Sequence, residues 1–334
     1  MNKTRRAFLR SVSVAAASLC GGCSLSAKMG KRQPDKIIDT HVHFYNPYRP
    51  QGIPWPTKRD ALLYRTVLPK DYRLQAVPQR VDGVIVVEAS PWLEDNQWIL
   101  DLAEQDPLIV GFVGNLPIGT AVFAEQLKRF SSNSLFRGVR IREGSLEAGL
   151  KDRLFLRDMH DLSERGLSFD VHSPPKWVEQ AVPLAQAVPG LRLIVNHVAN
   201  VSVTGGPPPE AWVTLMKRLA EQPNIFMKIS GLVEGTKRTA GDAPMDAAVY
   251  RPILESLWRF FGPDRLIYGS NWPVCGRYAP LDTVQRIAMD FFASKGQAAL
   301  DKVFWKNSIT AYHWKKRADT TETYEMEDVC DGRL

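Results

Sequence analysis

Two histidines one residue apart, His41 and His43, close an apolar run that starts at Ile37. If this run is a β-strand, its side chains alternate, so Asp39 and both histidines share a face with Ile37. Imidazoles at this spacing can bind one divalent metal ion together, because neutral imidazole is a common metal ligand. Buried or exposed histidines without a chemical role are the competing interpretation, so the meaning of the pair depends on where its strand lies.

Further polar residues close other apolar runs of the chain. The same alternation places Glu88 on the face of Val86 and His197 on the face of Val195, and His172 closes a third run. Carboxylates and imidazoles are the groups that move protons near neutral pH. The alternatives are a solvated loop carboxylate at Glu88 and a core or loop histidine at His172.

Two pairs of polar residues stand at alternate positions of apolar runs. Arg140 and Arg142 share one face of their run, and Lys228 and Ser230 share a face of a later one. If the opposite faces pack on helices, these side chains enter the interior, where a forked guanidinium matches a carboxylate. We therefore expect all four to bind substrate. Helix caps or surface salt bridges are the alternative for each alone.

Eight strand-like runs alternate with segments whose apolar residues have helical spacing. The runs cover residues 37–43, 83–88, 108–116, 136–141, 167–172, 191–197, 224–230 and 265–271, and the helical segments cover 97–104, 123–130, 154–165, 177–187, 212–221 and 250–261. This alternation predicts a parallel sheet, and eight such units close most economically into a (β/α)8 TIM barrel, an α/β fold. Barrel enzymes place their chemistry at the C-terminal ends of the strands, where these histidines fall.

The chain divides into a leader, one large unit and a tail. The barrel is predicted to cover residues 36–316, and residues 317–334 form a polar, acidic arm. Residues 46–78, rich in proline and aromatic residues, are too long for a plain connection, and we expect them to fold over the mouth of the barrel.

The first 29 residues have the features of an export signal. Arg5 and Arg6 precede an apolar, alanine-rich run from Val12 to Leu19, the order found in twin-arginine signals. The sequence therefore predicts export to the periplasm. The apolar run is too short for a stable membrane span, and Cys23 makes a lipid anchor the alternative to cleavage.

Composition argues against a disordered or fibrous chain, and the distribution of charge argues against a nucleic-acid-binding protein. The 44% of hydrophobic and 24% of charged residues are ordinary for a globular protein. The formal charge of +7 resides in residues 1–32, and the rest of the chain is balanced at 36 basic and 36 acidic residues. We therefore expect a small-molecule substrate and no nucleic-acid partner. Self-association into a homo-oligomer is left open.

Five segments together resemble the amidohydrolase-related branch of the amidohydrolase superfamily, which includes sugar-lactone and 2-pyrone-4,6-dicarboxylate lactonases. They are Ile38-Asp39-Thr40-His41-Val42-His43-Phe44, Gly138-Val139-Arg140, Asn196-His197, Lys228-Ile229-Ser230-Gly231 and Arg265-Leu266-Ile267-Tyr268-Gly269-Ser270-Asn271-Trp272-Pro273. The segments span Lys36 to His313 in the order that a barrel requires. The resemblance implies a barrel of the amidohydrolase type.

The resemblance also implies hydrolysis of a C–O or C–N bond in a small carbonyl compound, a lactone or a cyclic amide. His41, His43 and His172 would hold a divalent metal, zinc by the resemblance, or His41 and His43 would polarise the carbonyl directly, as in metal-independent members. His197 would bind the substrate carbonyl and Arg140 a substrate carboxylate. A sister branch catalyses zinc-dependent decarboxylation of unsaturated acids, and His172 keeps that alternative open.

One residue departs from the family pattern. Members have Asp at the end of strand eight, where it takes a proton from the attacking water, and this chain has Asn271. A carboxamide cannot act as that base. A hydroxide bound to the metal would need less help from a base. Alternatively, Glu88 or His197 would move the proton while Asn271 orients the water or a metal ligand. The third possibility is a non-catalytic periplasmic binding protein on a retired barrel.

Overall fold

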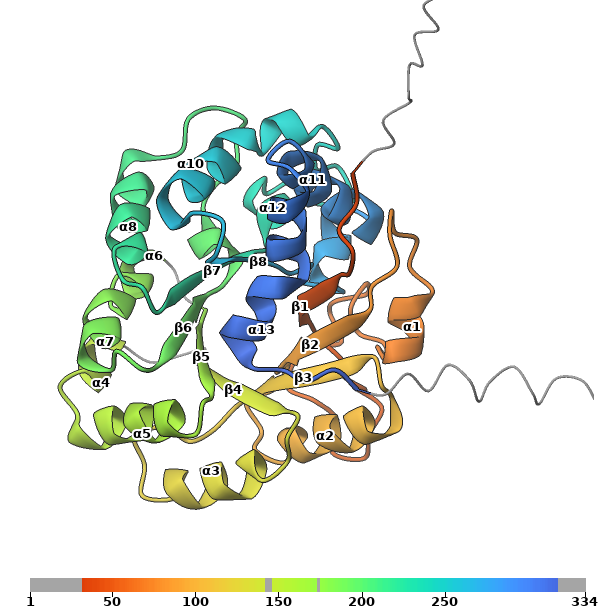
Figure 1. The fold of residues 1–334 in the computed structure, drawn as a ribbon. Helices are drawn as coiled ribbons and strands as arrows, with labels where there is room; N and C mark the ends of the chain where they lie inside the picture. The colour runs from red at the N-terminus through yellow and green to blue at the C-terminus, as the bar shows by residue number, and fades with distance from the viewer. Residues whose placement is uncertain (1–31, 142–145, 173–174, 318–334) are drawn as a thin grey trace, which may run out of the picture. The chain divides into compact units, whose positions relative to one another are not determined.

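The computed structural model describes residues 32–141, 146–172 and 175–317 (Figure 1). The predicted leader with Cys23, the arm beyond Arg317 and the predicted substrate residue Arg142 lie outside these ranges. What the sequence suggests about them stays a prediction.

Eight parallel strands follow one another around a ring in the order of the chain. They are β1 (Ile38–Val42), β2 (Gly83–Val87), β3 (Ile109–Gly114), β4 (Phe136–Ile141), β5 (Ser168–Val171), β6 (Arg192–Val195), β7 (Ile225–Ile229) and β8 (Leu266–Tyr268). Backbone bonds join the end of β8 to the end of β1: the Asn271 amide donates to the His41 carbonyl at 2.8 Å, and the His43 amide donates to the Trp272 carbonyl at 2.9 Å. The predicted (β/α)8 barrel is confirmed.

Helices surround the ring in Figure 1 and cover one of its ends. They are α1 (Pro69–Arg73), α2 (Asp95–Gln105), α3 (Phe123–Ser131), α4 (Leu146–Gly149), α5 (Arg153–Glu164), α6 (Pro175–Val178), α7 (Ala181–Ala187), α8 (Glu210–Ala220), α9 (Leu232–Gly235), α10 (Arg251–Phe261), α11 (Leu281–Ala293), α12 (Gln297–Asp301) and α13 (Asn307–Tyr312). The segment predicted as one helix over 177–187 is broken before α7, because Pro183 fits the first turn of a helix but would clash inside a continuous one. Within the described ranges, no helix has the length and apolarity to span a membrane.

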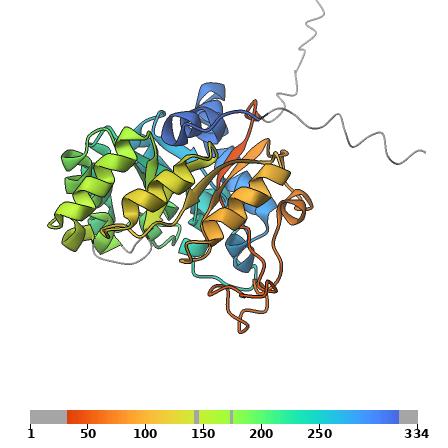
Figure 2. The ribbon, with the colours of Figure 1, turned by 90° about the horizontal axis from the view of Figure 1, so that it is seen from below.

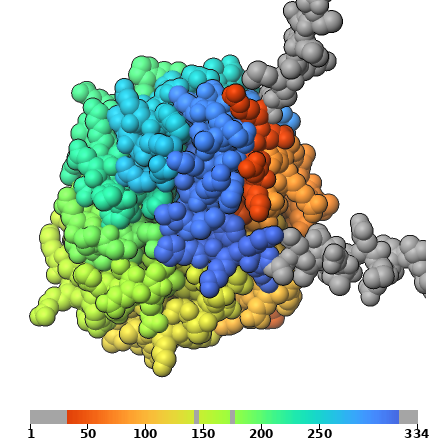
Figure 3. All heavy atoms as spheres, viewed as in Figure 1, coloured from red at the N-terminus to blue at the C-terminus, as the bar shows by residue number. Residues whose placement is uncertain are grey.

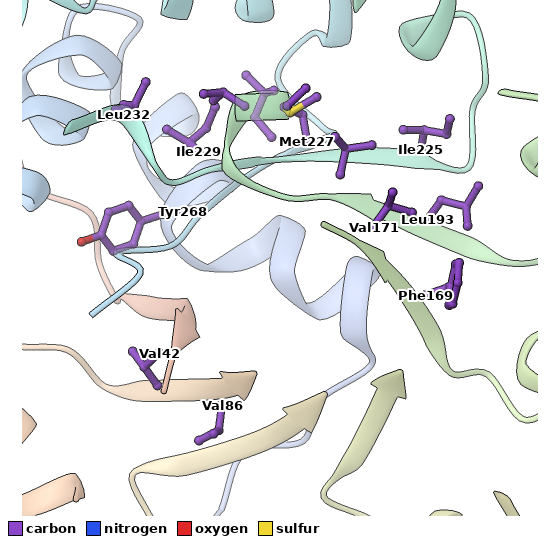
Figure 4. Close-up of a cluster of buried hydrophobic side chains, with 14 of the residues drawn as sticks. Val42, Val86, Phe169, Val171, Leu193, Ile225, Met227, Ile229, Leu232 and Tyr268 are labelled. Atoms are coloured by element: carbon purple, nitrogen blue, oxygen red, sulfur yellow. The ribbon is translucent and has the colours of Figure 1, made fainter. Parts of the chain in front are cut away.

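Side chains of the strands form two separate clusters. Ile85, Val87 and Ile194 pack together with residues of β1, β3, β7 and β8, so they fill the inside of the ring. Val86 and Val195 belong instead to the large cluster between strands and helices, part of which Figure 4 shows. The main hydrophobic core therefore lies outside the ring, as expected for a barrel wrapped by helices.

This division corrects the predicted alternation for three strands. Val86 and Val195 were expected to face inward with Glu88 and His197, and Ile37 with His41, but all three pack outward. Glu88 and His197 follow the last residues of β2 and β6, where alternation no longer applies. In β1 the pairing with β2 shifts register between Asp39 and Val42, which turns His41 inward.

The two ends of the barrel are covered by different parts of the chain. In Figure 1, α13 lies over the centre of the ring, and Figure 3 shows the C-terminal helices across the same face. In Figure 2 the insertion after β1 hangs from the opposite side. Trp55 of that insertion lies 5.9 Å from the His43 ring, between ring centroids, so the insertion covers the end that carries the histidines.

A buried ion pair stands inside the ring beneath α13. Lys228 of β7 donates to Asp170 of β5 at 2.9 Å, and both side chains are fully buried. The Tyr312 hydroxyl of α13 donates to the same carboxylate at 2.9 Å. A buried charge is tolerated only when its hydrogen bonds are satisfied, so α13 serves the ion pair as well as closing the barrel.

Replacing Tyr312 with Phe leaves the Asp170 carboxylate one donor short in a buried site. We expect the free energy of unfolding to fall by about 1–3 kcal/mol. Tyr268 is the matched control, because it is equally buried and its hydroxyl has no partner among the described residues. Tyr268→Phe should change stability by less than about 0.5 kcal/mol. Urea denaturation of both variants checks this, and equal losses would contradict the role of α13.

Candidate functional site

The histidines at the strand ends form one cluster. Ring centroids lie 5.0 Å apart for His41 and His43, 4.4 Å for His41 and His197, and 5.0 Å for His172 and His197. The structure thus brings together imidazoles from β1 and from the segments after β5 and β6. This is the end of the barrel where its enzymes carry their chemistry.

Lys228 fixes the proton of His41. The Lys228 ammonium lies 3.4 Å from His41 Nδ1, and an ammonium can only donate. His41 Nδ1 is therefore the acceptor, and the ring proton resides on Nε2. Burial, followed by the neighbouring His197 and Lys228, lowers the pKa of His41 well below its usual value. The ring is neutral at pH 7, and its Nε2–H is buried without a partner among the described residues.

His197 is held by unusual backbone and by Ser230. Residues 197–200 all have left-handed φ, and Trp212 Nε1 donates to the Val198 carbonyl at 2.9 Å. His197 Nδ1 lies 2.9 Å from Ser230 Oγ. A side chain at Gly231 would meet the His197 Cβ at 2.6 Å, so only glycine leaves room for this ring. Such strain clusters at functional sites. Burial, followed by electrostatic repulsion from His172, lowers the pKa of His197 well below its usual value.

Asn271 lies between His43 and a carboxyl group. Its Oδ1 is 3.2 Å from His43 Nε2, and its Nδ2 donates to Glu234 Oε1 at 2.8 Å. Burial raises the pKa of Glu234 to about 7, against the opposing effect of the hydrogen bond from Asn271. The other ring nitrogen of His43 lies 2.8 Å from the Val87 carbonyl oxygen.

Arg140 and Glu88 form a buried pair at the same end of the barrel. Arg140 Nε donates to Glu88 Oε1 at 2.7 Å, and Arg140 Nη2 donates to the Glu88 backbone carbonyl at 2.5 Å. Both side chains are 3% exposed. The guanidinium faces inward as predicted, but two of its donor groups bind this chain's own glutamate. The predicted substrate carboxylate would have to bind through the rest of the guanidinium.

A pocket opens beside the histidine cluster, between the insertion and the end of β2. It is lined by Glu88 and by aromatic, polar and charged residues of neighbouring segments, among them Trp55, Trp98, Arg49 and Asn96. Trp55 also contacts His43, so the pocket adjoins the cluster. No histidine of the cluster lines this pocket, and Ile99 and Phe112 of its lining belong to the core between strands and helices.

The described side chains do not fit a metal ion well. They contain no group of three or more His, Cys, Asp or Glu placed to bind one. The ring nitrogens of His43 face the Val87 carbonyl and Asn271, and Lys228 occupies the Nδ1 side of His41. The zinc site predicted at His41, His43 and His172 stays a prediction, and no step below depends on it.

Three residues of the site were missed from the sequence. Asp170 lies on β5, two residues before His172. The alternation of side chains that was used for the other inward residues would have placed Asp170 on the same face as His172. Trp55 lies in the insertion, whose path no local pattern predicts. Glu234 lies on the short helix α9 after β7, and nothing in its sequence neighbourhood distinguishes it from an exposed helix carboxylate.

Two relatives of known name are similar over most of the chain. L-fucono-1,5-lactonase of Burkholderia ambifaria is 28% identical over 239 residues, which cover 71% of this chain and 80% of that protein. L-rhamnono-gamma-lactonase of Scheffersomyces stipitis is 24% identical over 335 residues, which cover 83% and 98% of the two chains.

Solved structures support the fold. An amidohydrolase from Burkholderia multivorans with bound zinc superposes with a TM-score of 0.75 at 23% identity, covering 84% of this chain and all of the other. A dihydroxybenzoic acid decarboxylase from Polaromonas with bound manganese gives a TM-score of 0.58 at 12% identity, covering 86% and 99% of the two chains. Both share the architecture of this chain.

The sequence also matches a family as a whole. The family described as Amidohydrolase matches residues 38–314, which include every strand of the barrel and the whole histidine cluster. This chain belongs to the amidohydrolase family of enzymes.

Proposed function

We propose that this chain hydrolyses a sugar lactone to the corresponding hydroxy acid. Two of its relatives carry the names of sugar lactonases. We also propose export to the periplasm, with a lipid anchor at Cys23 as the alternative to cleavage of the leader.

The observation that carries this proposal is the unpartnered Nε2–H of His41. A buried donor without an acceptor is costly, and such exceptions occur where a ligand completes the bond. The ammonium of Lys228 at the other ring nitrogen makes this N–H a stronger donor. It would bind the lactone carbonyl oxygen and stabilise the negative charge that develops there when water attacks.

The remaining residues divide the proton transfers. Water adds to the carbonyl carbon, its proton passes to a base, and the ring C–O bond then breaks as the leaving oxygen takes up a proton. His197 is neutral and adjoins His41, so it is the proposed base and later acid, with Ser230 holding its ring. Glu88, held by Arg140, is the proposed second proton-transferring group and lines the pocket.

A metal would supply carbonyl polarisation if His41, His43 and His172 held zinc, as the sequence predicts. We propose the His41 N–H for that task instead, because it is buried without a partner among the described residues. Zinc-dependent decarboxylation and simple ligand binding have no observation of their own here. An assay of the purified chain on a panel of five- and six-membered sugar lactones separates all three. Proton release supports the proposal, and carbon dioxide release or binding without turnover contradicts it.

Replacing His41 with Phe removes the donor at the carbonyl. We expect kcat on the best lactone to fall by about 10²–10³-fold, as for other single donors to a developing oxyanion. His41→Gln keeps an acceptor for Lys228 and an N–H, so it should retain more activity than Phe. His160→Phe, on the exposed face of α5, is the control and should leave kcat unchanged. Equal activity of His41→Phe and wild type would exclude His41 from the reaction.

Metal removal tests the assignment of carbonyl polarisation. We expect that dialysis against a strong chelator leaves kcat within about twofold of its starting value, because hydrogen-bond donors alone can stabilise the charge. The measurement is lactone hydrolysis alongside elemental analysis of the dialysed protein. A loss of activity that zinc restores would instead place a metal at the histidines.

A further inference from the structure

The residue that replaces the family's strand-eight aspartate is tied to a carboxyl group that the sequence does not reveal. Asn271 has a left-handed φ of 61°, and its backbone amide donates to His41. Its side chain therefore has a fixed starting point. From there Oδ1 lies 3.2 Å from His43 Nε2, and Nδ2 lies 2.8 Å from Glu234 Oε1.

The charge state of Glu234 decides which way the Asn271 amide points. An ionised carboxylate only accepts hydrogen bonds, so it requires the NH2 end of the amide. The amide oxygen must then point away from Glu234 and toward the histidines. A protonated Glu234 would offer a donor instead and would favour the reversed amide. The carboxylate thus selects the orientation in which position 271 presents an acceptor to the site.

Glu234 stands in surroundings that make this control sensitive to pH. Its Oε2 is shielded from solvent and has no hydrogen-bond partner among the described residues. The titratable groups that it influences are Tyr250 and Cys275, whose pKa values are raised mainly by burial and further by Glu234. Burial raises the pKa of Glu234 itself to about 7.

We propose that Glu234 is a positioning residue for the hydrolysis, holding the Asn271 amide with its oxygen directed at the attacking water. The unit of Glu234 and Asn271 would replace the single aspartate of related enzymes, with the negative charge moved one hydrogen bond away from the histidines. The inference rests on the proposed lactonase activity and adds a residue to its machinery.

Moving the carboxylate from position 234 to position 271 is the sharpest test of this proposal. Glu234→Gln removes the charge, and we expect kcat to fall about tenfold with KM nearly unchanged, the size of one hydrogen bond to a charged group. Asn271→Asp places two carboxylates in contact, so one must hold a proton, and activity should also fall. The double variant Glu234→Gln/Asn271→Asp restores one charge and one amide. Its kcat should recover to within about threefold of wild type, because one carboxylate and one amide again face each other. The double-mutant cycle would then give a favourable coupling energy between the two positions.

The pH profile and a matched control separate positioning from mere structure. In wild type the acidic limb of the activity profile, where activity is lost as pH falls and Glu234 takes up a proton, should follow an apparent pKa of about 7 in the lactone assay, and Glu234→Gln should lose that limb. Glu255→Gln, a partly buried glutamate of α10 paired with Lys295, should keep both kcat and profile. If Glu234→Gln keeps the wild-type kcat and pH profile, the positioning role is wrong, while the lactonase proposal stands.

Unfolding gives a readout that does not need activity. Because the folded pKa of Glu234 is above its ordinary value of 4.5, its stabilising contribution is present below pH 4.5 and is lost as pH rises through about 7. The free energy of unfolding, measured by urea denaturation between these pH values, should fall as pH rises, and Glu234→Gln should flatten this slope.

If wild type hydrolyses no lactone, the proposed function fails. The interaction between Glu234 and Asn271 can then still be tested by measuring the free energy of unfolding of the two single variants and the double variant. If the double variant loses less free energy of unfolding than the two single variants lose together, orientation of Asn271 by Glu234 is supported. If the losses are additive, it is wrong.

Discussion

A buried ammonium at the centre of the barrel determines the state of the site above it. Lys228 bonds Asp170 on one side and faces His41 on the other, with no exposed surface of its own. Removing one partner of such a pair typically costs about 3–5 kcal/mol, because a charge is left buried and unpaired. The carboxylate, the Tyr312 hydroxyl and the helix that carries it are therefore needed for the ammonium to stay in place.

The chemistry follows from where that charge lies. A cation against Nδ1, together with burial, keeps His41 neutral and puts its proton on the nitrogen that has no partner. On the opposite side of the cluster, Asn271 brings a carboxamide rather than a charge next to His43, and the carboxylate of Glu234 stands behind it. Lys228 thus lies one hydrogen bond from His41, and the Glu234 carboxylate lies two hydrogen bonds from His43. His41 and His197, which burial keeps neutral, can hydrogen-bond a carbonyl or accept a proton near pH 7, whereas an imidazolium can only donate.

The sequence predicted the fold and the gathering of the histidines because both depend on strand order. The alternation of strand-like and helical segments predicted the barrel. In a barrel the C-terminal ends of all strands lie at one end, so the four histidines were expected to lie close together, as they do: His41, His43, His172 and His197. Alternation within strands was less reliable. The register shift in β1 reversed the inward face, which no propensity signals.

Residues that approach from loops could not be predicted in this way. Glu234 reaches Asn271 from a short helix after β7, and Trp55 reaches His43 from an insertion of irregular path. Their contacts depend on backbone conformations that local sequence does not specify. Glu88 was found at its strand end, but its pairing with Arg140, which was predicted to bind substrate, appears only in three dimensions.

The protonation of His41 is the most direct test of this account. Nitrogen NMR of the protein labelled in its histidine rings, with His41→Gln used to assign the signal, distinguishes the two tautomers and the charged ring. The account predicts a neutral ring with its proton on Nε2 throughout the range from about pH 6 to 8, because the pKa is well below the usual value. A proton on Nδ1, or a charged imidazolium at neutral pH, would contradict it.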